Sequence, residues 1–142
     1  MQLVIALGGG LNPESLARSV ARTNTIVVGY APQLELLQKA DLTITHAGMN
    51  TALESLSNGV PMVAIPITND QPGVAARITW TGTGEKVSPS KANAKKLRTT
   101  IQQVLTNDSY QKNAIKLQHA IQQAGGHRKA ADIIEQVINS RV

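Results

Sequence analysis

Residues 45–51 have the sequence THAGMNT, and they lie between an apolar run that begins at Leu42 and a stretch with apolar residues at helical spacing. This order predicts a strand, a tight turn and the N-terminus of a helix. The first N–H groups of a helix have no partner within it and carry a partial positive charge, so they form an anion site. Gly48 would let a phosphate approach the backbone closely, and we therefore expect a phosphate group at this turn.

Polar side chains flank the predicted helix start. Asn50 or Thr51 can cap the helix and also present a donor, and His46 at the strand end can donate to the same anion. Glu54 follows Asn50 by four residues and shares its helix face, where its carboxylate would accept from hydroxyls. Taken singly, Asn50 could be only a cap, Glu54 a solvated residue and His46 a loop histidine.

Five short apolar runs alternate with stretches at helical spacing, and they begin near residues 3, 25, 42, 62 and 84. The first two predict buried parallel strands. In the helix after residue 48, Leu53 and Leu56 should face the core. This pattern predicts an α/β, Rossmann-like fold in which a doubly wound parallel sheet forms the middle of three layers. The 142 residues form one predicted domain, and the last third is helical.

Polar residues and an aromatic residue follow two other predicted strands. Tyr30 and Gln33 lie where a strand end would let them contact a flat base, although Tyr30 could instead cap the core. Asp70 and Gln71 follow the strand near residue 62, and a carboxylate beside an amide suits recognition of neighbouring hydroxyls. Asp70 could also be an N-cap.

Composition limits the partners and the metal chemistry. The chain has a net charge of +5, mean hydropathy of −0.11, no cysteine and only three aromatic residues. The aromatic count is low for stacking bases, which argues against a nucleic-acid partner. The absence of cysteine suits the cytoplasm, and no apolar run is long enough to span a membrane. No Asp-x-Asp pair is present to hold a magnesium diphosphate, so no metal and no cofactor is expected.

The motifs occur together in a recognisable order. Residues 30–33 are YAPQ, residues 46–51 are HAGMNT, residues 59–61 are GVP and residues 70–71 are DQ. This set resembles the donor-sugar signature of GT-B nucleotide-sugar glycosyltransferases, known as the plant secondary product glycosyltransferase box. Residues 70–78, DQPGVAARI, are most similar to the bacterial zeaxanthin glucosyltransferases within that family.

The resemblance implies that residues 1–142 are the nucleotide-sugar binding half of a GT-B enzyme, with UDP-glucose as the donor. Tyr30 stands where the family usually has tryptophan. The tyrosine ring offers uracil a smaller stacking face than tryptophan would. The implied roles are diphosphate binding by His46, Gly48, Asn50 and Thr51, base and ribose binding by Tyr30, Gln33 and Glu54, and sugar binding by Asp70 and Gln71.

The resemblance also implies an inverting, metal-independent displacement in which UDP departs. The acceptor pocket and the general base belong to an N-terminal domain that is absent here, so this chain has no catalytic residue and should be inactive alone. The acceptor would be a small hydrophobic molecule such as a carotenoid, which allows peripheral membrane association of the full enzyme. Two alternatives are a donor-binding subunit of a split glycosyltransferase and a non-catalytic nucleotide-sugar-binding module.

Overall fold

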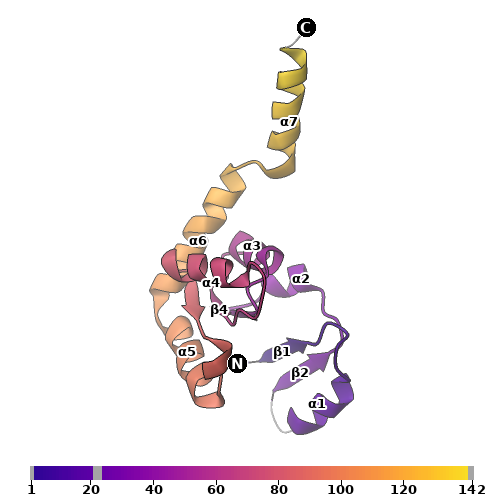
Figure 1. Cartoon of the computed structure of the whole chain (residues 1–142), viewed down its shortest axis with the longest axis vertical. Coiled ribbons are helices and arrows are strands. Elements are labelled where there is room, and N and C mark those ends of the chain that lie inside the picture. The colour runs from indigo at the N-terminus through magenta and orange to yellow at the C-terminus, as the bar shows by residue number, and fades with distance from the viewer. Residues whose placement is uncertain (1, 21–23, 141–142) are drawn as a thin grey trace. The chain divides into compact units, whose positions relative to one another are not determined.

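The computed structural model describes residues 2–20 and 24–140 as an α/β structure with parallel strands (Figure 1). The chain divides into two compact units, of which the first ends at Leu36 and the second begins at Leu37. The short helix α2 (Gln33–Leu37) contains this boundary. Helices alternate with parallel strands in the order that the apolar runs predicted.

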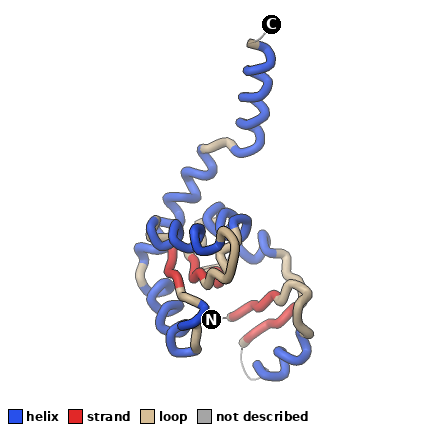
Figure 2. Tube along the Cα trace, viewed as in Figure 1, coloured by secondary structure: helices blue, strands red, loops and turns tan. Residues whose placement is uncertain are grey.

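The first unit contains β1 (Leu3–Ala6), α1 (Pro13–Val20) and β2 (Thr25–Val28). The two strands pair in parallel and lie side by side in Figure 2. The Asn12 Oδ1 accepts a 2.9 Å hydrogen bond from the backbone N–H of Glu14, so Asn12 caps α1. A cap at this position stabilises the helix that joins the two strands.

Much of the sheet in the first unit is uncovered. Leu3, Val4 and Ile26 are 41%, 36% and 44% exposed. The sequence predicted buried strands here, and that prediction is wrong for these side chains although the strands are correctly placed. The physical reason is that α1 packs on β2, and one helix covers only one face of a sheet.

The second unit contains a three-stranded parallel sheet in the order β3 (Thr43–Thr45), β4 (Met62–Ala64) and β5 (Gly84–Lys86). Strands β3 and β4 pair so that Thr45, the last residue of β3, lies opposite Ala64, the last residue of β4. The carboxyl ends of these strands therefore meet at one edge of the sheet. Loops that follow them are brought together at that edge.

Helices cover both faces of this sheet, and they are α3 (Met49–Ser57), α4 (Gln71–Trp80) and α5 (Ala94–Thr106). Met62 and Ala64 belong to a buried cluster with residues of α3 and α4. Val63, which lies between them, packs in a second cluster with Val104 of α5. Because successive residues of a strand point to opposite faces, the second unit has the three-layer arrangement predicted from the sequence.

Hydrogen bonds to β5 and to the end of α3 attach the later helices. A 3₁₀ turn (Pro89–Lys91) precedes α5. The Tyr110 hydroxyl donates a 2.5 Å hydrogen bond to Glu85 Oε1 and accepts a 2.8 Å bond from Gln103 Nε2. Tyr110 lies in α6 (Asp108–Gln123), which also packs against α3. The hydrogen bond to Glu85 is the main cause of a raised Tyr110 pKa.

The last helix, α7 (Gly126–Asn139), follows Gly125, whose φ of 77° is the left-handed conformation that ends many helices. All residues of α7 are exposed. Its apolar residues, predicted from their helical spacing, include Ile134 and Ile138, which are 60% and 61% exposed.

Candidate functional site

The turn between β3 and α3 is held by local contacts. Ala47 has a φ of 66°, a left-handed conformation that alanine rarely adopts. Its N–H donates a 3.1 Å hydrogen bond to Thr45 Oγ1, and its side chain is completely buried in the core cluster. Burial of the Ala47 side chain and the hydrogen bond to Thr45 together hold this strained backbone in place. This geometry directs the chain from the strand edge into the start of α3.

His46 lies directly against Gly48. A Cβ added to Gly48 would be 2.6 Å from His46 Nε2 and 3.3 Å from Cε1, so the imidazole occupies the space that any larger residue would need. Gly48 has φ −61° and ψ 138°, which any residue can adopt. A larger residue at position 48 would therefore displace the imidazole, whereas the backbone angles there would accept it. The exposed His46 is placed beside the N-terminus of α3.

The start of α3 has no side-chain cap. The helix begins at Met49 with Gly48 at the N-cap position, so Asn50 and Thr51 lie within the first turn. The prediction that Asn50 or Thr51 caps the helix is wrong, because a cap residue needs non-helical backbone angles and the chain is already helical there. A helix start without a side-chain cap keeps backbone N–H groups for water or for an anion.

Glu54 is half-buried on α3, four residues after the exposed Asn50, as their spacing predicted. Leu56 packs against the core, but Leu53 is 47% exposed, which contradicts the prediction that it faces inward. The buried face of α3 is instead formed by Ala52 and Ser55. Small residues there allow the helix to approach the sheet closely.

Ser55 is a supporting residue that the sequence analysis missed. It is completely buried, and its hydroxyl lies 2.8 Å from the Thr51 carbonyl oxygen and 3.2 Å from Thr43 Oγ1 of β3. The bond to Thr43 fixes α3 against the strand. Its sequence signal would have been a small polar residue in the middle of an otherwise apolar helix face.

Asp70 and Gln71 lie at the start of α4, in the loop that follows β4. Asp70 is exposed and takes the N-cap position, but it has helical backbone angles and its side chain makes no cap hydrogen bond. The alternative that Asp70 serves as a side-chain cap is therefore not supported. Gln71 Oε1 accepts hydrogen bonds from the N–H groups of Ile67 at 2.8 Å and Thr68 at 3.0 Å.

A groove of about 540 Å³ runs along α3 and α4, from Met49 and Asp70 at their starts to Leu56 and Thr81 near their ends. Met49 and Leu53 lie on the α3 side, and Asp70 and Arg77 lie on the α4 side. The register of β3 and β4 places the THAGMNT turn and the loop carrying Asp70 at the same sheet edge, as expected for loops that follow adjacent parallel strands.

Tyr30 and Gln33 belong to the first unit. Tyr30 is 85% exposed, which contradicts the alternative that it caps the core and leaves its ring face accessible for stacking. Gln33 is exposed at the beginning of α2. Base binding by these two residues stays a prediction.

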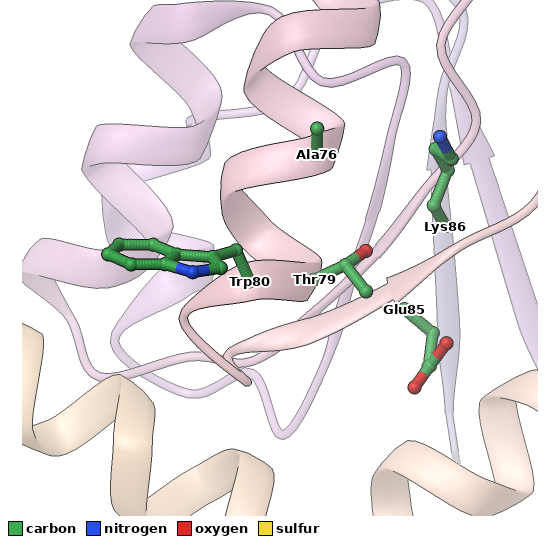
Figure 3. A pocket seen from close by; sticks show the side chains of 5 residues that line it. All are labelled: Ala76, Thr79, Trp80, Glu85 and Lys86. Carbon is green, nitrogen blue, oxygen red and sulfur yellow. The ribbon is translucent and has the colours of Figure 1, made fainter.

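A second hollow, of about 400 Å³, lies at the other end of α4 (Figure 3). Trp80 is 78% exposed there, with the Arg77 guanidinium 5.7 Å from its ring centre. In Figure 3 the side chains of Trp80, Glu85 and Lys86 point in different directions, and Glu85 is already bonded to Tyr110. A ligand site needs polar groups that converge, so this hollow is a poor candidate.

Residues 2–20 and 24–140 offer neither a clustered metal site nor a membrane-spanning helix. In these ranges no three His, Asp or Glu side chains are grouped as ligands for a metal ion. None of the helices there has the length and apolar character needed to cross a bilayer.

Comparison with known proteins gives consistent results. Residues 4–124 match the family described as UDP-glucoronosyl and UDP-glucosyl transferase. The zeaxanthin glucosyltransferase of Pantoea ananas is 43% identical over 143 aligned residues, which cover 96% of this chain and 32% of that protein. These matches confirm the resemblance recognised from the motifs.

Two solved structures extend the similarity to the fold. The glycotransferase of kitacinnamycin matches with a TM-score of 0.79 and 25% identity, over 94% of this chain and 42% of that one. A UDP-glucose: anthocyanidin 3-O-glucosyltransferase, solved in complex with UDP, matches with a TM-score of 0.74 and 26% identity, over 89% of this chain and 30% of that one. The structural neighbours are GT-B glycosyltransferases, which confirms the predicted fold class. The chain spans about a third of the length of the curated relatives it matches.

Proposed function

Because the chain belongs to the UDP-glucoronosyl and UDP-glucosyl transferase family, we propose that it binds a nucleotide sugar, with UDP-glucose as the donor. The observation that carries the proposal is the start of α3, where an N-terminus without a side-chain cap lies beside the His46 imidazole. Both features favour a diphosphate, because each offers N–H donors to negative oxygens. His46, Gly48, Asn50 and Thr51 would bind this group.

The nucleoside and the sugar would use the remaining predicted residues. Tyr30 has an exposed ring on which uracil can stack, Gln33 follows three residues later, and Glu54 would accept from the ribose hydroxyls. Asp70 and Gln71 would bind the hexose. A carboxylate accepts and an amide can donate, so the pair complements hydroxyl groups that do both.

We infer that the complete enzyme inverts the anomeric carbon by direct displacement. The acceptor oxygen forms a bond to that carbon while the bond to the UDP oxygen breaks, and the leaving diphosphate gains negative charge. Donors fixed in place before the reaction, such as the His46 imidazole and the N–H groups of α3, stabilise that charge without reorganising. This mechanism needs no metal ion, and metal independence is part of the proposal.

The acceptor and the general base are proposed to lie outside this chain. The zeaxanthin glucosyltransferase of Pantoea ananas is about three times as long as the match, which leaves room for an acceptor-binding half. That relative is named for zeaxanthin, which supports a small hydrophobic acceptor of the carotenoid type. Catalysis would require both halves, because the acceptor hydroxyl must be aligned with the anomeric carbon and water must be excluded.

The proposal is tested by titrating the 142-residue chain with UDP and with UDP-glucose in the presence of EDTA. An open site predicts weak binding, with Kd on the order of 0.1–1 mM. His46→Ala should raise the Kd of both ligands alike by at least about tenfold, because a charge-assisted hydrogen bond is lost. His119→Ala is the matched control, since His119 is an exposed histidine on α6.

The outcomes separate the parts of the proposal. Equal binding by His46→Ala and the parent chain would remove His46 from the site. Binding that requires a divalent metal would overturn the metal-independent mechanism. A glucosyl-transfer assay run beside the titration should show no product, and robust transfer by the purified chain would overturn the division into two halves.

A further inference from the structure

The carboxamide of Gln71 is used by the loop that precedes it. Its Oε1 accepts from the backbone N–H of Ile67 at 2.8 Å and of Thr68 at 3.0 Å. Two convergent N–H donors require an acceptor, so the oxygen of the amide must face them and the nitrogen must face away. Within the described part of the chain, Gln71 Nε2 makes no hydrogen bond.

The loop held in this way carries Asp70. Asn69 has a φ of 55°, a left-handed conformation that asparagine tolerates, and the chain turns there before α4 begins. The backbone N–H of Gln71 also donates to the Thr68 carbonyl oxygen at 3.2 Å. Gln71 therefore closes the loop through both its backbone and its side chain, and the exposed Asp70 carboxylate lies on the segment that is closed.

We propose that Gln71 is a positioning residue that holds residues 67–70 in place and offers the donor sugar hydrogen-bond donors only. A sugar hydroxyl that contacts Gln71 then accepts from Nε2, and a hydroxyl that contacts Asp70 donates to its carboxylate. The sugar contact in this inference rests on the proposed function, whereas the loop contacts do not. The direction of each sugar hydrogen bond is fixed, because Gln71 Oε1 is already occupied by the loop and the Asp70 carboxylate can only accept.

Two substitutions separate holding the loop from donating to the sugar. Gln71→Glu keeps an acceptor of the same shape for Ile67 and Thr68 but removes the N–H donors. Gln71→Met keeps a side chain of similar length and removes both functions. Gln102→Glu, at an exposed position of α5, adds the same charge away from the loop and serves as the control.

The first measurement needs no ligand. Amide hydrogen exchange at Ile67 and Thr68 should be faster in Gln71→Met by roughly two- to tenfold, the size expected for one lost hydrogen bond at each amide. Gln102→Glu should exchange at the parent rate, and Gln71→Glu should exchange no faster than the parent, because a carboxylate accepts at least as strongly as an amide oxygen. Equal exchange in Gln71→Met and the parent would overturn the positioning role whatever the chain binds.

The second measurement is the ratio of the Kd for UDP to the Kd for UDP-glucose. In Gln71→Glu this ratio should fall by roughly two- to tenfold. Its loop amides should still be protected from hydrogen exchange, so a purely structural role of Gln71 would not explain the fall. An unchanged ratio in Gln71→Glu would overturn the donor-only contact. If the parent chain binds UDP-glucose no more tightly than UDP, both the sugar contact of Gln71 and the proposed sugar subsite are wrong. If it binds neither ligand, the proposed function fails, and the exchange rates alone decide the positioning role.

Discussion

Replacement of Gly48 by alanine tests the contact between the turn and the imidazole. The backbone angles at Gly48 suit alanine, so the new methyl group acts through space and not through backbone strain. It would lie 2.6 Å from His46 Nε2, whereas ordinary contacts begin at about 3.4 Å. The imidazole must therefore move by about 1 Å to restore a normal distance.

A displacement of this size is enough to break a hydrogen bond, which weakens steeply with misalignment. A charge-assisted hydrogen bond contributes about 1.5–3 kcal/mol, so Gly48→Ala should raise the Kd for UDP by roughly 10- to 150-fold. The effect on folding should be smaller, because alanine in place of glycine at an N-cap costs about 0.5–1 kcal/mol.

The assay is an NMR titration with UDP of the parent chain, Gly48→Ala, His46→Ala and the double variant. If the methyl group acts through the imidazole, Gly48→Ala should cost almost nothing once His46 is alanine. The control is Gly73→Ala on α4, where no atom lies within 4 Å of the added Cβ. An equal loss from Gly48→Ala with and without His46 would refute the reasoning and would show that the methyl group blocks the ligand itself.

Glu54→Gln should weaken the binding of UDP more than the binding of 2′-deoxy-UDP in the same titration, because only UDP loses a hydroxyl contact. Equal losses of affinity for the two nucleotides would contradict ribose binding by Glu54. Tyr110→Phe removes the donor to Glu85 and should lower the free energy of unfolding in urea by about 1.5–3 kcal/mol, with unchanged UDP affinity. Because the Tyr110 pKa is raised on folding, this stabilisation is complete below about pH 10 and decreases as the pH rises through the folded pKa. Parallel pH profiles of stability for Tyr110→Phe and the parent chain would contradict this assignment.

The order of elements could be predicted because each strand carries its own apolar signal. Met62, Val63 and Ala64 form a continuous apolar run, which is typical of a strand covered on both faces, and the structure buries all three completely. The strands of the first unit have the same kind of signal, yet Val4 and Ile26 are exposed. A local pattern indicates which residues can be buried, whereas burial itself depends on how many helices cover the sheet.

The details of the candidate site depended on backbone geometry that residue types do not reveal. The turn into α3 was predicted but its cap was not, because Ala47 adopts a left-handed conformation normally left to glycine or asparagine and the helix already begins at Met49. Similarly, the sequence predicted that the Gln71 amide recognises hydroxyls, but it could not show which atom of the amide faces them. The structure assigns the oxygen to the N–H groups of Ile67 and Thr68, a contact that depends on the path of the loop.

The residues that stabilise the second unit differ from those proposed to bind the donor. Ser55 and Tyr110 are buried and hydrogen-bonded across elements, so replacing either should reduce stability. His46 and Asp70 are exposed, and Asp70 does not cap the helix that it precedes. Their loss should therefore cost little folding free energy. Side chains kept out of the core at the carboxyl edge of a parallel sheet are available to a ligand, which is the physical basis for assigning the site to this edge.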